Sequence, residues 1–193
     1  MSRSYDTRGE EPPEGSREPS ARFGPLGSVD EDTVRRARRG DPVALDVVVR
    51  ALAPYVGRIC GAIAMDDKGD DAMQEAMLII VRRLPSLREP AALRGWARRI
   101  AVRESLRVAG SARSIPVDPD ALAIVPAVSD DATAVEVRAV LDSLEPYQRA
   151  VLVLRHLDGL AEAEMAELLD VAPGTIKSRL YRARAAFRSR WST

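Results

Sequence analysis

The sequence predicts an all-α protein made of two small helical domains joined by a flexible linker. Apolar residues recur at steps of three and four along most of the chain from Val29 onward, which is the period of one helix face. Aromatic residues are 4% and hydrophobic residues 46% of the 193 residues, so the core must be aliphatic, a composition that favours helices. A segment with three prolines and four acids, residues 109–132, divides the helical pattern in two.

The first 28 residues are expected to be a disordered tail. They are rich in Pro, Gly, Ser and Glu and lack the apolar residues needed to form a core. They also lack the apolar run of a secretory signal. No apolar run in the chain reaches the roughly 18 residues needed to cross a bilayer. We therefore expect a cytoplasmic protein with no membrane insertion of its own.

Residues 29–108 are expected to form the first domain. One apolar stripe follows helical spacing over residues 45–63, a second runs from Met73 to Leu84, and a third begins at Leu93. Pro85 and Pro90 mark a break between the second and third helices. Three such helices can close a small bundle around one core.

Residues 109–132 are interpreted as a linker. Their charge differs from that of the whole chain. The chain has 29 basic and 29 acidic residues, but this segment has one basic and four acidic residues. The neutrality of the whole chain is therefore a cancellation between segments. Fully extended, the linker could reach roughly 80 Å at about 3.3 Å per residue, which is about two turns of DNA.

Residues 133–193 are expected to form the second domain, which ends in two short helices. Gly159 interrupts the helical pattern. The two helices are predicted at about residues 161–169 and 173–190, with a tight turn between them. Pro173 suits the first turn of the second helix because it lacks an N–H that would have no partner there. Ile176 and Leu180, four residues apart, are expected to anchor that helix. This is a helix-turn-helix arrangement.

The second of these helices carries positive charge without any acid. From Gly174 to the end there are six basic residues and no Asp or Glu. Basic side chains bind phosphates, and Arg or Lys can read guanine in the major groove, so the helix has the features of a DNA-binding element. The alternative is a solvated amphipathic helix whose arginines only maintain solubility. The positions expected to point outward are Thr175, Lys177, Ser178, Arg179, Tyr181, Arg182 and Arg184.

A resemblance to a known family begins at these residues. The chain has the run DGLAEAEMAELLDVAPGTIKSRLYRARAAF at residues 158–187, which resembles the C-terminal DNA-binding domain of extracytoplasmic-function (ECF) sigma factors of the sigma-70 family. The preceding helix, LEPYQRAVLVLRHLDGL, is also similar to its counterpart there. The resemblance implies that this domain, corresponding to sigma region 4, binds the minus-thirty-five promoter element. Two-component regulators share part of this pattern.

The N-terminal half carries a second resemblance, to sigma region 2. The run GDDAMQEAMLIIVRRLPSL at residues 69–87 is similar to the family's helix that grips core RNA polymerase, with Asp71, Gln74 and Glu75 in the matching positions. Asp71 and Glu75 lie one helical turn apart and are expected to face the same way. The alternative is an acidic helix start that is merely favoured by the helix dipole. GDPVALDVVVRALAPYVGRIC, residues 40–60, resembles the first helix of the same domain.

A third run, LRGWARRIAVRESLR at residues 93–107, resembles the family's next region, in which a helix and the loop before it open the minus-ten element. The loop corresponds to residues 85–92 here, and Trp96 is expected to belong to the core. Basic side chains on this helix could hold the backbone of a single strand. The residues expected to do so are Arg94, Arg98, Arg99 and Arg103.

The chain also departs from the family pattern. Residues 76–80 lack the aromatic residues common there, and Arg103 and Arg107 stand where many members have Asn and Asp. These departures leave promoter melting and base choice open.

The sequence offers no constellation for catalysis. Cys60 and His156 are the only residues of their types, so a zinc site and a histidine-dependent triad are both improbable, and Cys60 is expected to be a small buried residue. We expect no catalytic residues, no metal, no cofactor and no enzymatic activity.

The resemblance implies core RNA polymerase, promoter DNA and an anti-sigma factor as partners. The rival hypotheses are a stand-alone dimeric helix-turn-helix regulator and an adaptor that binds only protein.

Overall fold

The computed structural model describes residues 29–110 and 132–191, and within these ranges it is helical with no strand. The N-terminal half contains α1 (Glu31–Arg38), α2 (Pro42–Ile63), α3 (Asp66–Arg83), the short 3₁₀ turns η1 (Leu84–Ser86) and η2 (Pro90–Ala92), and α4 (Leu93–Gly110). The C-terminal half contains α5 (Ala132–Asp142), α6 (Pro146–Leu152), the π-helical turn η3 (Val153–Leu157), α7 (Glu162–Leu169) and α8 (Pro173–Trp191).

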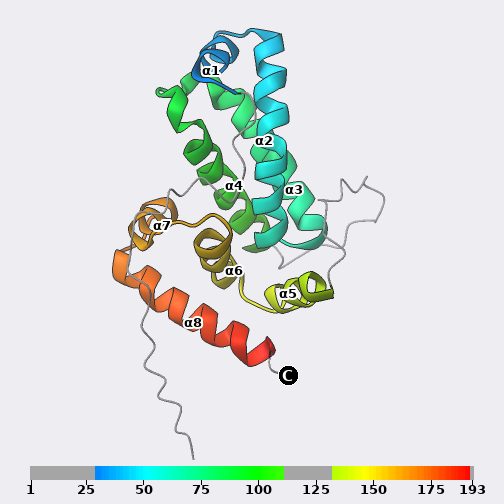
Figure 1. Cartoon of the computed structure of the whole chain (residues 1–193), viewed down its shortest axis with the longest axis vertical. Helices are drawn as coiled ribbons and strands as arrows, with labels where there is room; N and C mark the ends of the chain where they lie inside the picture. The colour runs from blue at the N-terminus through cyan, green and yellow to red at the C-terminus, as the bar shows by residue number, and fades with distance from the viewer. Residues whose placement is uncertain (1–28, 111–131, 192–193) are drawn as a thin grey trace, which may run out of the picture.

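In the N-terminal half, α2, α3 and α4 pack against one another, and α1 lies across their far end (Figure 1). Helix α2 begins at Asp41, whose carboxylate accepts hydrogen bonds from the backbone N–H groups of Val43 and Ala44 at 3.0 and 3.2 Å. Its buried face carries the predicted apolar stripe and continues through Pro54, which lies inside the helix. Cys60 is buried on the same helix, as expected.

In the C-terminal half, α6, α7 and α8 form a compact unit, and α5 packs against α8. Leu154 of η3, Met165 of α7 and Ile176 of α8 are fully buried and belong to the hydrophobic core. The observed α7 and α8 differ from the predicted ranges by one residue each. The expectation of an all-α fold is therefore confirmed, and the short helices lie where the turn and proline signals placed them.

The two halves touch through α6 and η3, which lie against α2 and α4 (Figure 1). The buried residues of both halves belong to one continuous hydrophobic cluster. Arg149 of α6 is buried and donates from Nε to the carbonyl of Ile63, the last residue of α2, at 2.7 Å. Since the last carbonyls of a helix lack partners within it, this arginine caps α2 from the other half.

The expected linker and tail fall largely outside the described residues. Helix α4 extends through Ala109 and Gly110, and α5 begins at Ala132, so these three positions of the expected segment 109–132 are helical. Residues 1–28 and 111–131 lie outside the described ranges.

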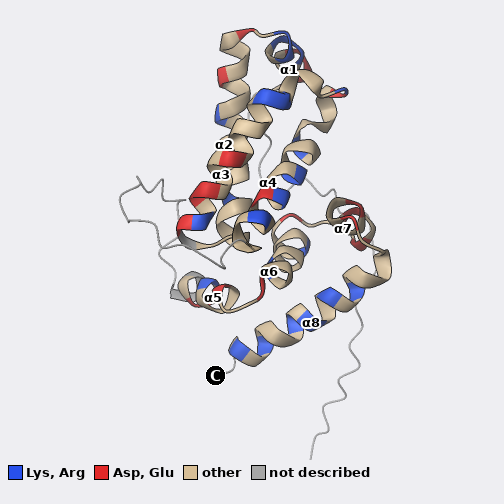
Figure 2. Ribbon diagram, turned by 180° about the vertical axis from the view of Figure 1, so that it is seen from behind, with Lys and Arg blue, Asp and Glu red and all other residues tan. Residues whose placement is uncertain are grey.

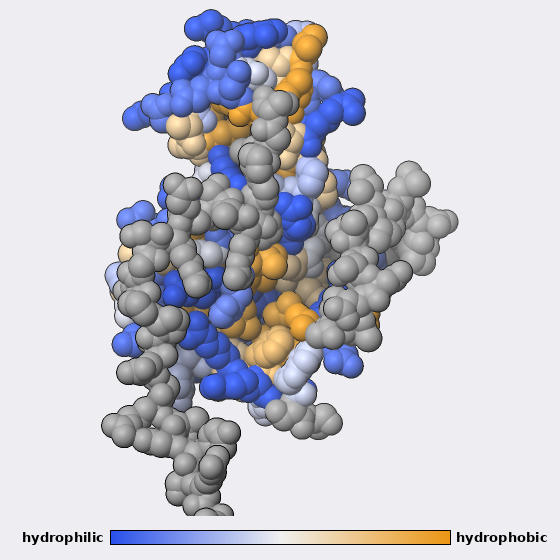
Figure 3. Space-filling model, viewed as in Figure 1, coloured by the Kyte–Doolittle hydropathy of each residue, from blue (hydrophilic) through white to orange (hydrophobic). Residues whose placement is uncertain are grey.

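On the face shown in Figure 3, hydrophobic side chains lie in separate patches among hydrophilic ones. In the part of the chain that the structure describes, no helix combines the length and apolar character needed to span a bilayer.

Candidate nucleic-acid interface

The turn between α7 and α8 is tight and well defined. Asp170 ends α7 in the left-handed conformation, with φ 52° and ψ 53°, which Asp tolerates better than most residues. The next N–H, of Val171, donates to the carbonyl of Ala166 at 3.0 Å, and Thr175 N–H donates to Ala172 at 2.9 Å. These bonds fix the direction in which α8 leaves α7, as a helix-turn-helix requires.

Helix α8 is held to the rest of its half along one stripe. Ile176, Leu180 and Ala183 are buried, so the two expected anchor residues do point inward. Near the C-terminal end, the rings of Phe187 and Trp191 stack with their centres 5.8 Å apart. The opposite face of α8 is therefore the one presented to solvent.

The exposed face of α8 carries most of the residues expected to bind DNA. Figure 2 shows basic residues along this helix and no acidic ones, and Tyr181 is 72% exposed. Thr175 is half-buried. The exposed members of the expected set are Lys177, Ser178, Tyr181, Arg182 and Arg184.

Arg179 lies differently from the other expected residues. Its side chain is half-buried, and the guanidinium carbon lies 5.0 Å from the centre of the Tyr147 ring on α6. Such a cation–π contact stabilises by about 0.5–1 kcal/mol or more. Arg179 therefore helps hold α8 against α6, whereas its neighbours Ser178 and Arg182 face solvent.

The basic face extends beyond the residues that sequence reasoning named. Arg188 and Arg190 are also exposed, in the last turns of α8. The absence of acids up to the chain end was the signal that could have identified them.

Helix α3 presents a second surface of a different kind. Asp71, Gln74 and Glu75 are all exposed on one face, as the helical spacing predicted, and acidic residues are visible on α3 in Figure 2. Leu78 and Val81 are exposed farther along the helix, at 48% and 37%. This face thus combines carboxylates with an apolar end, which is suited to a protein partner. The two apolar residues follow the same three- and four-residue spacing and could have been found from it.

Helix α4 places its four expected arginines in two different settings. Arg99 and Arg103 are exposed. Arg94 and Arg98 instead face the junction between the halves, where each side chain is 19% exposed. Their common neighbour is Asp158, a residue that sequence reasoning did not single out.

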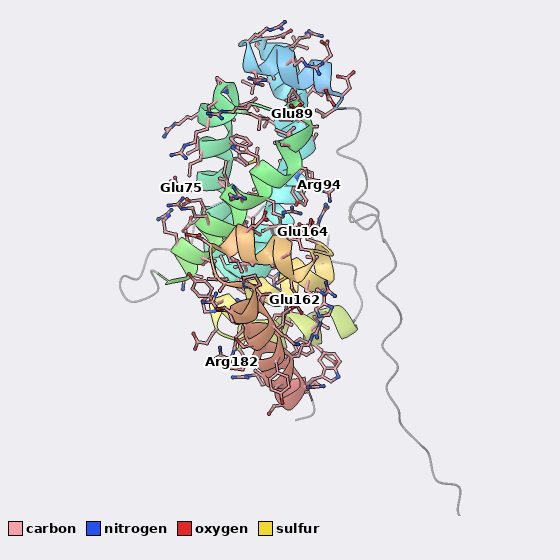
Figure 4. All side chains as sticks on the ribbon, turned by 90° about the vertical axis from the view of Figure 1, so that its left-hand side faces the viewer. Glu75, Glu89, Arg94, Glu162, Glu164 and Arg182 are labelled. Carbon is pink, nitrogen blue, oxygen red and sulfur yellow. The ribbon has the colours of Figure 1, made fainter. Side chains whose placement is uncertain are left out.

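Asp158 is surrounded by groups from the N-terminal half. Arg98 Nη1 donates to its Oδ2 at 2.7 Å, and the hydroxyl of Tyr55 donates to the same oxygen at 3.1 Å. Arg94 Nη2 lies 3.9 Å from Oδ1, and its guanidinium carbon is 4.6 Å from the centre of the Tyr55 ring. In Figure 4, Arg94 lies apart from Arg182, with Glu162 and Glu164 of α7 between them in the view.

The burial of this cluster changes its acid–base behaviour. Burial and the negative charge of Asp158 together raise the pKa of Tyr55 to about 12. Burial is the largest single influence on Arg98 and lowers its pKa, but the hydrogen bond to Asp158, the charge of Asp158 and the contacts with Tyr55 together outweigh burial, so the pKa is raised. Both residues therefore stay protonated at neutral pH.

Local geometry explains how Asp158 reaches the junction. The π-helical turn η3 adds a residue to the end of α6, and the N–H of Asp158 donates back to the carbonyl of Val153 at 3.1 Å. Gly159 follows with φ 72°, a conformation that glycine adopts without strain. The wide turn directs the Asp158 side chain inward, where only 2% of it is exposed.

Comparisons with known proteins identify the family. The family model described as "Sigma-70, region 4" matches residues 134–187. The ECF RNA polymerase sigma factor SigM of Mycobacterium tuberculosis is 34% identical over 149 residues, covering 76% of each chain. The chain belongs to the ECF RNA polymerase sigma factors.

This ECF sigma factor has further relatives. The ECF RNA polymerase sigma-E factor of Escherichia coli is 30% identical over 174 residues, covering 81% of this chain and 91% of the relative. Both alignments are longer than segment 133–193, so they include part of the N-terminal half. The α7–turn–α8 unit lies within the matched region 4.

Solved structures show the same fold for this ECF sigma factor. CnrH in complex with the cytosolic domain of CnrY aligns with a TM-score of 0.59 at 19% identity, covering 83% of this chain and 95% of that one. RpoE in complex with the anti-sigma factor NepR from Bartonella quintana aligns with a TM-score of 0.55 at 20% identity, covering 77% and 97%. Within residues 29–110 and 132–191, no group of three potential metal ligands lies together.

Proposed function

We propose that this ECF sigma factor binds core RNA polymerase and directs it to specific promoters. The observation that carries the proposal is the acid-free face of α8, which is exposed while the rest of the helix is anchored. In a family of transcription initiation factors, such a face is suited to duplex DNA. The residues proposed to contact the minus-thirty-five element are Thr175, Lys177, Ser178, Tyr181, Arg182 and Arg184, while Arg179, which was also expected to do so, lies against Tyr147 and supports the helix.

The N-terminal half, residues 29–108, is proposed to bind core polymerase and the minus-ten element. Asp71, Gln74 and Glu75 form the polymerase-binding face, which is supported by their common exposure on α3. Arg99 and Arg103 are exposed and available to a single strand, whereas Arg94 and Arg98 become available when the halves separate. The segment between the halves would then pass through polymerase.

We further propose that the protein acts in the cytoplasm and catalyses no reaction itself, because polymerase supplies the chemistry. An anti-sigma factor is a further proposed partner. CnrH and RpoE were solved with proteins bound, CnrY and the anti-sigma factor NepR.

In vitro transcription tests the proposal. Purified protein is mixed with core polymerase lacking any other specificity subunit, and run-off transcripts are sequenced across a genomic DNA library. We expect discrete start sites that share two upstream elements. Substitution of Asp71 and Glu75 by Ala should abolish these transcripts, and the pair Glu136→Ala and Asp142→Ala, two exposed acids on α5, is the matched control. An absence of discrete start sites with active core would contradict the proposal.

The stand-alone regulator makes a different prediction. A dimeric helix-turn-helix protein binds a palindromic site tightly without polymerase. A sigma factor alone binds DNA weakly and in a salt-dependent manner. Footprinting with and without core polymerase separates the two.

A further inference from the structure

Asp158 is a buried carboxylate whose cationic partners both come from the other half of the protein. Its side chain is 2% exposed, and the charged groups that contact it are Arg94 and Arg98 of α4. The third partner, the hydroxyl of Tyr55, belongs to α2. Among the residues that the structure describes, the charge of Asp158 is thus balanced by groups on the other side of the junction.

This arrangement has a consequence for the stability of the junction. A carboxylate removed from water is unfavourable unless it is paired and hydrogen-bonded. While the halves are together, Asp158 has an ion pair at 2.7 Å and a hydroxyl donor at 3.1 Å. If the halves separate, both the carboxylate and the two guanidinium groups regain water. The cluster therefore has two states in which its charges are satisfied.

The same cluster occupies two of the four arginines proposed to hold the minus-ten strand. Arg94 and Arg98 are covered in it, and Arg94 also lies over the ring of Tyr55. Arg99 and Arg103, on the same helix, are exposed. Only part of the proposed single-strand surface is accessible in this arrangement.

We propose that Asp158 is an interdomain latch that holds the two halves together and keeps Arg94 and Arg98 from nucleic acid until the halves separate. The inference about nucleic acid rests on the proposed function, whereas the inference about the junction does not. The acid-free face of α8 lies on the opposite side of its helix from the buried stripe, so the latch leaves it exposed. The closed protein can thus present α8 to duplex DNA while part of α4 is withheld.

A distance measurement tests the latch without polymerase or DNA. Val43→Cys at the start of α2 and Ala185→Cys on α8 place spin labels on exposed positions of the two halves. Cys60 is buried and does not compete for label. Pulsed electron paramagnetic resonance should give one narrow distance distribution for the doubly labelled protein. Adding Asp158→Asn should broaden it and move a large fraction to longer distances.

The matched control is Asp170→Asn. It removes one negative charge from the same half, but Asp170 is exposed and adopts a left-handed conformation that Asn also tolerates. The control should keep the original distance distribution. Circular dichroism should show equal helix content for both variants. An unchanged distribution in Asp158→Asn would overturn the proposal.

The second readout is binding of a fluorescein-labelled 12-nucleotide single strand of mixed sequence to the full chain. If opening exposes Arg94 and Arg98, the Asp158→Asn protein should bind the single strand about tenfold more tightly than the wild-type protein. The reason is that the open state, in which both arginines are accessible, is no longer a minor part of the population. Adding Arg94→Ala and Arg98→Ala should remove this gain. Longer distances with unchanged binding would overturn the masking role and count against the proposed DNA role of the two arginines. Run-off transcription by the wild-type protein would remain a separate test of sigma activity.

Tyr55→Phe provides a milder variant that keeps the ring beneath Arg94. It removes one hydroxyl donor to Asp158 and should shift the distance distribution in the same direction by a smaller fraction. If Asp158→Asn fails to fold, the test rests on Tyr55→Phe. An unchanged distance distribution in that variant would overturn the proposal that Asp158 holds the halves together.

Discussion

Gly69 of α3 lies directly against Gly61 of α2. A β-carbon built at position 69 would come within 2.9 Å of the Cα of Gly61, and within 3.4 Å of its backbone nitrogen. A β-carbon at position 61 would meet nothing within 4 Å. The crossing of the two helices therefore depends on the absence of a side chain at one of the two glycines.

Gly69→Ala should destabilise the protein, whereas Gly61→Ala should not. The first substitution forces the backbones of α2 and α3 apart, and overpacking of this kind typically lowers the free energy of unfolding by about 1–3 kcal/mol. The second adds a methyl group in open space and should raise the free energy of unfolding by up to roughly 1 kcal/mol, because alanine favours the helix. Urea unfolding followed by circular dichroism measures both. Equal effects would contradict the close crossing.

Alkaline pH should weaken the protein partly through Tyr55. Its pKa is raised from 10.0 to about 12 in the fold, so the fold favours the neutral phenol. The resulting stability is complete below about pH 10 and is lost as the pH rises toward about 12. Urea midpoints measured between pH 9 and 11 should therefore fall more steeply in the wild-type protein than in Tyr55→Phe. If the urea midpoints of the two proteins fall in parallel with pH, the fold does not raise the pKa of Tyr55.

Cys60 should react with thiol reagents only when the protein opens. Its pKa is raised from 9.0 to about 11, mainly by burial. That rise alone lowers the reactive thiolate fraction at pH 8 by about a hundredfold, and the side chain is fully buried. Reaction with Ellman's reagent should be slow in buffer and fast in urea. Val43→Cys, at an exposed position, is the control and should add one fast-reacting thiol. A fast thiol in the wild-type protein would contradict this burial.

Lys177→Ala and Arg182→Ala should each weaken promoter binding by the polymerase complex. Both side chains are exposed on the acid-free face of α8. Loss of one phosphate contact should reduce the slope of log affinity against log salt by about one. Arg50→Ala is the control, because that exposed arginine pairs with Asp46 on α2. Filter binding over a salt series checks the result, and equal slopes in all variants would favour the protein-only adaptor.

Local signals in the sequence predicted the helices well. Pro173 and the spacing of Ile176 and Leu180 placed α8 and its buried face correctly, because proline and helical periodicity act within one element. The common exposure of Asp71, Gln74 and Glu75 followed from the same periodicity.

Contacts between elements were not predictable in the same way. Arg98 and Asp158 are sixty residues apart, and nothing in the period of either helix indicates that they meet. Arg149 would be expected at the surface from its charge, yet it is buried because three backbone carbonyls accept its hydrogen bonds. Arg179 was expected to face outward, but it is half-buried because Tyr147 of another helix lies beside it.

The separation between Arg98 and Asp158 also has a meaning for biosynthesis. At about 5–20 residues per second, the ribosome needs roughly 3–12 s to add the sixty residues between them. During that interval α4 emerges before its acidic counterpart has been translated. The nascent N-terminal half can fold around its own apolar stripe, but the junction closes only after Asp158 has been synthesised, which makes this ion pair one of the late events in maturation of the chain.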